Sequence, residues 1–90
     1  MSTDDAWLDP LKAKFAIRLA GEADTFLALV AAKDCEGLIE RAHKLAGLAG
    51  MLGAPAVGEA ALRLEETLRS GRSWKAELTA LLVAIAEATR

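Results

Sequence analysis

The chain of 90 residues has room for one domain with one hydrophobic core, and a composition that is 53% hydrophobic but only 4% aromatic makes that core aliphatic. A net charge of −2 with both signs interspersed offers no basic stripe for nucleic acid, and no apolar run approaches the roughly 20 residues that span a bilayer. The acidic, polar N-terminus is the opposite of a signal peptide, so we expect a cytoplasmic protein with protein partners.

The first helix is predicted to begin at Asp9 and Pro10, an N-cap residue followed by proline at the first helical position. Its apolar residues recur every three or four positions and form one stripe: Leu11, Phe15, Leu19, Ala23, Phe26 and Val30. Asp34 is expected to cap a second helix. The stripe of that helix consists of Leu38, Ala42, Leu45, Ala49 and Leu52.

The third helix is predicted to open with Pro55, directly after Gly53 has ended the second, and to stop at Ser70 and Gly71. Its apolar stripe consists of Val57, Ala61, Leu64 and Leu68. Ser73 is expected to cap a fourth helix, which runs to the end of the chain. The stripe of the fourth helix consists of Trp74, Leu78, Leu81, Ile85 and Ala88.

Four amphipathic helices with short connections pack most simply as an antiparallel up-down bundle. No segment alternates with the period of a strand, so the sequence predicts an all-α domain over residues 1–90. The first ten residues can add a short N-terminal turn, in which Trp7 and Leu8 would fold over one end of the bundle.

His43 is the only histidine, and it is predicted to point outward, because at 100° per residue it lies about 140° from the core stripe of the second helix. Gly47 and Gly50 flank it on the same face. Each glycine costs about 1 kcal/mol relative to alanine inside a helix. Bundle packing gives no reason for glycine on the outside, so we expect another protein to approach the backbone here.

The predicted docking surface has His43 at its centre. Ile39, Ala46, Gly47 and Gly50 surround it on the second helix, and Leu62 contributes an apolar contact from the third. An imidazole is largely neutral near pH 7 and is then a good nucleophile. Exposed on a docking surface, it is suited to accepting a phosphoryl group and passing it to a carboxylate on a partner.

The residues around His43 resemble the phosphorylation motif of histidine phosphotransfer (HPt) domains. Those domains share a histidine, an apolar residue at +2, glycine at +4, and leucine or phenylalanine followed by glycine at +9 and +10. The matching residues here are Leu45, Gly47, Leu52 and Gly53. The resemblance continues along the third helix through Val57, Ala61, Leu64, Glu65, Arg69 and Gly71.

The resemblance implies a four-helix bundle that relays phosphoryl groups between receiver-domain aspartates, from a hybrid kinase to a response regulator, with His43 modified on Nε2. It also implies that Glu65, 22 positions later, holds Nδ1; the helix geometry alone leaves Glu65 as a flank charge. One departure stands out. Many HPt domains have lysine at +3, where this chain has Ala46. Lys44 at +1 either swings toward the phosphoryl group or serves only as a solubilising charge.

Two alternatives remain open at the sequence level. The bundle can be a helical docking module that carries no phosphate, with Gly47 and Gly50 as a close-packing seam, or a degenerate HPt domain that binds a receiver or kinase. We expect a monomeric phosphoryl carrier without kinase activity, cofactor or metal, because no nucleotide-binding motif is present and one histidine with one cysteine does not make a zinc site.

Overall fold

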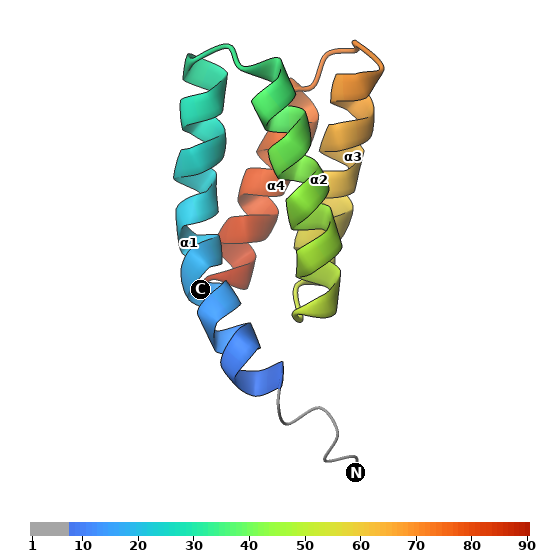
Figure 1. The fold of residues 1–90 in the computed structure, drawn as a ribbon. Coiled ribbons are helices and arrows are strands. Elements are labelled where there is room, and N and C mark those ends of the chain that lie inside the picture. Colours follow the sequence, from blue (N-terminus) through green and yellow to red (C-terminus); the bar gives the residue numbers. More distant parts are fainter. Residues whose placement is uncertain (1–7) are drawn as a thin grey trace.

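The computed structural model describes residues 8–90, which form four α-helices and no strand (Figure 1). Consecutive helices run antiparallel, which confirms the all-α up-down bundle. The bounds are α1 Asp9–Ala31, α2 Cys35–Met51, α3 Pro55–Arg69 and α4 Lys75–Ala88. The turn expected around Trp7 lies outside the described residues. Within residues 8–90, no helix combines the length and the apolar character that crossing a membrane requires.

Local chemistry sets the ends of α2 and the start of α3 as the sequence predicts. The Asp34 side chain accepts a hydrogen bond from the Gly37 amide over 2.9 Å and thereby caps α2. Gly53 adopts a φ of +92° in the turn that follows, a conformation that glycine reaches at little cost. Pro55 then opens α3.

The other two starting points differ from the prediction by one residue. α1 begins at Asp9 itself, because the preceding Leu8 already has near-helical dihedral angles and no side chain caps the helix. α4 is entered from Trp74 rather than from Ser73. The half-buried Trp74 side chain packs against the core, so packing rather than a serine cap fixes this end.

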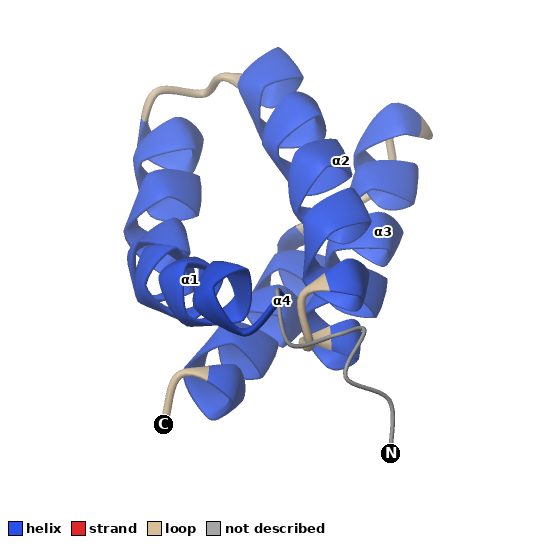
Figure 2. Cartoon of the chain, turned by 60° about the horizontal axis from the view of Figure 1, so that its bottom comes forward, coloured by secondary structure: helices blue, strands red, loops and turns tan. Residues whose placement is uncertain are grey.

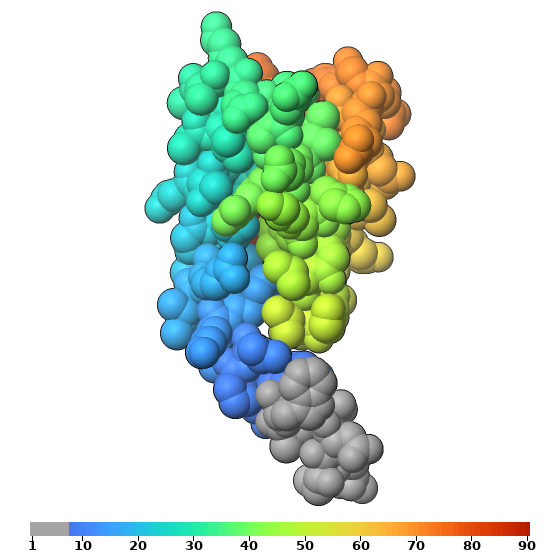
Figure 3. Space-filling model, viewed as in Figure 1, coloured from blue at the N-terminus to red at the C-terminus, as the bar shows by residue number. Residues whose placement is uncertain are grey.

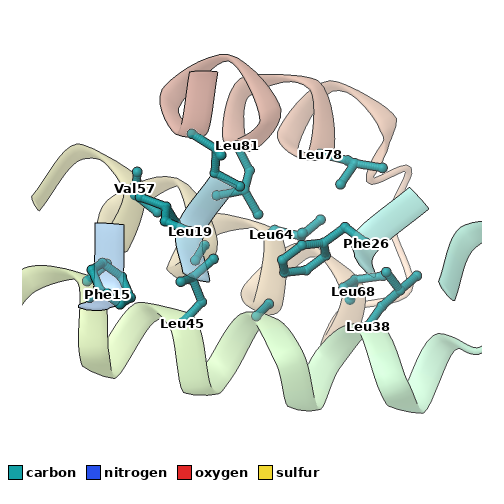
Figure 4. Packing of buried hydrophobic residues seen from close by; sticks show 14 residues of the cluster. Phe15, Leu19, Phe26, Leu38, Leu45, Val57, Leu64, Leu68, Leu78 and Leu81 are labelled. Carbon is teal, nitrogen blue, oxygen red and sulfur yellow. The ribbon is translucent and has the colours of Figure 1, made fainter. Parts of the chain in front are cut away.

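The core is aliphatic except for two phenylalanines, and every helix contributes to it (Figure 4). Its buried members are Phe15, Leu19, Phe26, Leu38, Ala42, Leu45, Ala49, Val57, Ala61, Leu64, Leu68, Leu78, Leu81 and Ile85. Leu11, which the periodicity placed in the stripe, is 43% exposed. The 23-residue α1 is longer than its neighbours, and its first turns project past the end of the bundle (Figures 1 and 3).

Helices α2 and α3 form the most extensive helix pair of the bundle. Gly58 of α3 allows their close approach, since a Cβ at this position would lie 3.2 Å from the amide nitrogen of Gly50 and 3.3 Å from the carbonyl oxygen of Ala46. The ribbon of α1 stands further from α2 (Figure 2). A bidentate ion pair between Arg41 and Glu22 connects α2 to α1.

Candidate functional site

His43 projects from the middle of α2 into solvent, as its angular position predicts. Its neighbours Ala42 and Leu45 point into the core and are fully or almost fully buried. The imidazole is 70% exposed. A residue in this position adds little to packing, so its side chain is available to another molecule.

Glu65 of α3 lies directly beside the imidazole. Both carboxylate oxygens, Oε1 and Oε2, are 3.1 Å from Nδ1 of His43. The carboxylate is only 9% exposed. Helical angles placed Glu65 at a flank of α3; the close packing of α2 on α3 covers that flank and buries the side chain. Among the described residues no hydrogen bond involves Nε2 of His43, whereas Nδ1 contacts Glu65, so the two ring nitrogens have different surroundings.

Arg69, one turn further along α3, binds the same carboxylate. Its Nε donates to Oε2 of Glu65 over 2.8 Å. Burial is the strongest influence on Glu65 and by itself raises the pKa of a carboxyl group. The hydrogen bonds from Arg69 and His43, together with their charges, outweigh burial and lower the pKa of Glu65 below its ordinary value. Glu65 is therefore ionised at neutral pH, and its carboxylate oxygens can accept a hydrogen bond from a proton on Nδ1 of His43.

Small residues border the histidine along α2 toward its C-terminus. A Cβ added to Gly47 or Gly50 would have no heavy atom within 4 Å apart from its own helix, so neither glycine is required by internal packing. A shallow groove of 290 Å³ follows on the same side. Its lining consists of Ala46, Gly50, Pro55, Gly58, Glu59 and Leu62.

The predicted docking residues are thus only partly brought together. Ala46, Gly50 and Leu62 share the groove, and Leu62 is 48% exposed there. Gly47 is exposed beside His43. Ile39 is half-buried and packs against the core, so it presents less of its side chain to a partner than its position on the helix suggests.

Lys44 does not join His43 in this structure. Its Nζ lies 3.0 Å from Oε1 of Glu40, one turn back on α2, and both side chains are largely exposed. Lys44 and Glu40 line a depression together with residues of α1, whereas His43 contacts α3. Across the part of the chain that the structure describes, no cluster of three or more histidine, cysteine or acidic side chains has the arrangement of a metal site.

Sequence reasoning missed two residues of this region. Arg69 was noted only as part of a pattern, although its i+4 spacing from Glu65 is the usual spacing of a helical ion pair. Gly58 was passed over, although a glycine on the inward face of a helix is a signal of close helix packing.

Comparison with known proteins gives one match. A family model described as Hpt domain matches residues 11–89, which covers all four helices except the first two residues of α1. No curated protein and no solved structure matches the chain.

Proposed function

The chain belongs to the Hpt domain family, whose members carry phosphoryl groups in phosphorelays, and we propose that this chain carries its phosphoryl group on Nε2 of His43. The partners we propose are receiver domains, those of a hybrid histidine kinase and of a response regulator. Each presents a phosphorylatable aspartate.

The observation that carries this proposal is the asymmetry of the His43 ring. Nδ1 lies 3.1 Å from the buried carboxylate of Glu65, while the imidazole as a whole is 70% exposed. An ionised carboxylate holds the proton on Nδ1, which leaves the lone pair of a neutral imidazole on Nε2. The nucleophilic nitrogen is then the one that a partner can reach.

The transfer step that follows from this arrangement is a displacement at phosphorus. The Nε2 lone pair attacks the phosphoryl group of a receiver phosphoaspartate, the N–P bond forms, and the P–O bond breaks with its electrons on the aspartate carboxylate. The proton stays on Nδ1, so the ring becomes positively charged. Glu65 faces that charge and stabilises it. Transfer to the next receiver runs the same step in reverse, with the receiver's own magnesium ion stabilising charge on the phosphoryl oxygens.

We propose that the receiver docks over His43 and the small residues beside it. Gly47 and Gly50 leave the α2 backbone uncovered, and the adjoining groove ends at the exposed Leu62. A receiver active site is a recess around its aspartate, so it needs a partner surface without bulky side chains next to the nucleophile. Glycine and alanine provide that surface.

The test is phosphoryl loading followed by transfer. Wild-type protein and His43→Gln are treated with phosphoramidate, a small phosphoryl donor, and their intact masses are followed; a receiver domain and Mg²⁺ are then added. We expect one acid-labile phosphoryl group on the wild type, none on His43→Gln, and its passage to the receiver. Unchanged circular dichroism of His43→Gln is the control for folding.

Two results would refute the proposal. Equal loading of His43→Gln would place the phosphoryl group elsewhere. A folded wild-type protein that never loads, yet binds a receiver, would make the chain a docking module, the alternative favoured by the absence of lysine at position 46.

A further inference from the structure

Among the cations of residues 8–90 that lie near His43, only one contacts the histidine–carboxylate pair. Lys44 binds Glu40, and Arg41 binds Glu22 of α1 on the side away from α3. Arg69 instead donates to Oε2 of Glu65, the same oxygen that lies 3.1 Å from Nδ1 of His43. Because both contacts share one atom, Arg69 Nε lies within about 6 Å of Nδ1, inside the screening length of about 8 Å at physiological ionic strength.

We infer that Arg69 is a positioning residue for phosphotransfer: its guanidinium fixes the Glu65 carboxylate against Nδ1 of His43 and provides the positive charge that many Hpt domains have at +3. The inference rests on the proposed role of His43 and deepens it. It places on α3 the positive charge that the family pattern has on α2, at the position that Ala46 occupies in this chain.

Geometry supports the first half of this inference. The Glu65 side chain is buried to nine-tenths, and a buried carboxylate has few ways to satisfy its oxygens. Arg69 makes the shortest of its hydrogen bonds, at 2.8 Å against 3.1 Å to His43. Arg69 itself is 59% exposed, so its guanidinium holds Glu65 from the solvent side without being buried.

Charge balance supports the second half. Burial raises the pKa of Glu65, and the two charged groups that oppose burial are Arg69 on α3 and His43 on α2. When His43 is neutral, Arg69 is the remaining cation that keeps Glu65 ionised. When Nε2 carries a phosphoryl group, Arg69 offsets the negative charge that then gathers around the ring.

The test uses Arg69→Gln, with Arg69→Lys as the conservative variant and Arg63→Gln as the matched control. Arg63 is an exposed arginine of the same helix that lines the groove between α3 and α4 and does not touch Glu65. In unphosphorylated protein, the Glu65 carboxyl carbon and the His43 ring nitrogens are followed by NMR over a pH series. We expect the pKa of Glu65 to rise in Arg69→Gln, and part of the His43 ring population to move its proton from Nδ1 to Nε2. Arg69→Lys should restore part of the wild-type behaviour, and Arg63→Gln all of it.

Loading by phosphoramidate provides the second measurement. We expect Arg69→Gln to load about tenfold more slowly at neutral pH, the size that one charge-assisted hydrogen bond commonly contributes, with Arg69→Lys in between. The inference would be overturned if Arg69→Gln matched the wild type in the titration of Glu65, in the tautomer of the His43 ring and in the loading rate. If the wild type itself never loads, the proposed function fails, and the NMR titration still decides the positioning role: an unchanged Glu65 and ring tautomer in Arg69→Gln overturn it, and the expected changes support it.

Discussion

At the scale of single residues, the site pairs an exposed base with a buried acid. His43 needs exposure to meet its partner, whereas Glu65 needs burial to act strongly, because a charge is screened less away from water. The α2–α3 interface meets both needs, since α2 carries the base outward and the packing of α2 on α3 buries the acid. The contact is 3.1 Å long and joins residues 22 positions apart.

Replacing Glu65 by glutamine tests the charge without removing the shape. The amide oxygen can still accept from Nδ1–H, but the negative charge that stabilises the phosphorylated ring is lost. We expect Glu65→Gln to be loaded by phosphoramidate about tenfold more slowly than wild type. Glu66→Gln, which changes the exposed neighbouring acid, is the control and should load normally. Wild-type loading of Glu65→Gln would show that His43 works without a counter-charge.

Glu65 also predicts a pH dependence of stability. Its pKa is lowered in the folded protein from the ordinary 4.5, mainly because the Arg69 and His43 hydrogen bonds outweigh the opposing effect of burial. A lowered folded-state pKa contributes stability that is present above the ordinary pKa and is lost as the pH falls through the folded-state value. We therefore expect the free energy of unfolding, measured with urea, to fall more between pH 6 and pH 3 for the wild-type protein than for Glu65→Gln. Equal losses for the two proteins would contradict the shift.

At the scale of helices, two glycines whose backbones come close at the α2–α3 interface have opposite roles. A Cβ on Gly50 would point into open space, whereas a Cβ on Gly58 would press against the backbone of α2. We expect Gly50→Ala to stabilise the fold by up to about 1 kcal/mol, the helix propensity gain, and Gly58→Ala to destabilise it by about 1–3 kcal/mol through overpacking. Urea unfolding at pH 7 measures the change in unfolding free energy for each variant. Changes of the same sign in the two variants would contradict the packing of α2 on α3.

The same open space predicts how docking can be blocked. A glutamate at position 47 or 50 fits the helix but projects into the proposed receiver surface with a charge. We expect Gly47→Glu and Gly50→Glu to accept phosphate from phosphoramidate at the wild-type rate and to transfer it to a receiver at least tenfold more slowly. Normal transfer by either variant would move the docking surface elsewhere on the bundle.

Local sequence signals predicted the helices well wherever one residue determines an end. Asp34, which accepts from the Gly37 amide, Gly53 with its positive φ, and Pro55 all act within one turn, so their effect can be predicted from neighbouring residues. The start of α4 could not be read this way, because Trp74 is held by packing against distant parts of the core.

The same reasoning explains the gaps in the predicted site. The outward position of His43 follows from helix periodicity alone. The burial of Glu65 depends on how closely α3 approaches α2, a distance set by Gly58 and by residues far away in the sequence. Leu11 was placed in the core because periodicity says which face a residue occupies, not whether a neighbouring helix extends far enough to cover it.

At the scale of the whole molecule, the bundle is not equally tight throughout. α2 and α3 form the most extensive pair, α4 packs closely on α3, and α1 makes fewer contacts with α2 and α4. Phe15, Leu19 and Phe26 insert from α1 into the core (Figure 4). The proposed site lies wholly on the tight pair, so the geometry of His43 and Glu65 does not depend on small movements of α1.

This unequal packing predicts which part of the fold opens first. Arg41 on α2 donates two hydrogen bonds to Glu22 on α1, whose side chain is 12% exposed. Hydrogen bonding to Glu22 is the main reason that the pKa of Arg41 is raised. Glu22→Gln removes the charge from this bridge while keeping the side chain's size. We expect amide hydrogen exchange in α1 to become about five- to tenfold faster, with α2 and α3 nearly unchanged, because the local opening of α1 loses a partly buried ion pair. Asp24→Asn, an exposed acid on the same helix, is the control for a general charge effect. Equal acceleration in all four helices would mean that α1 opens only with the whole molecule, and that the bundle is a single cooperative unit.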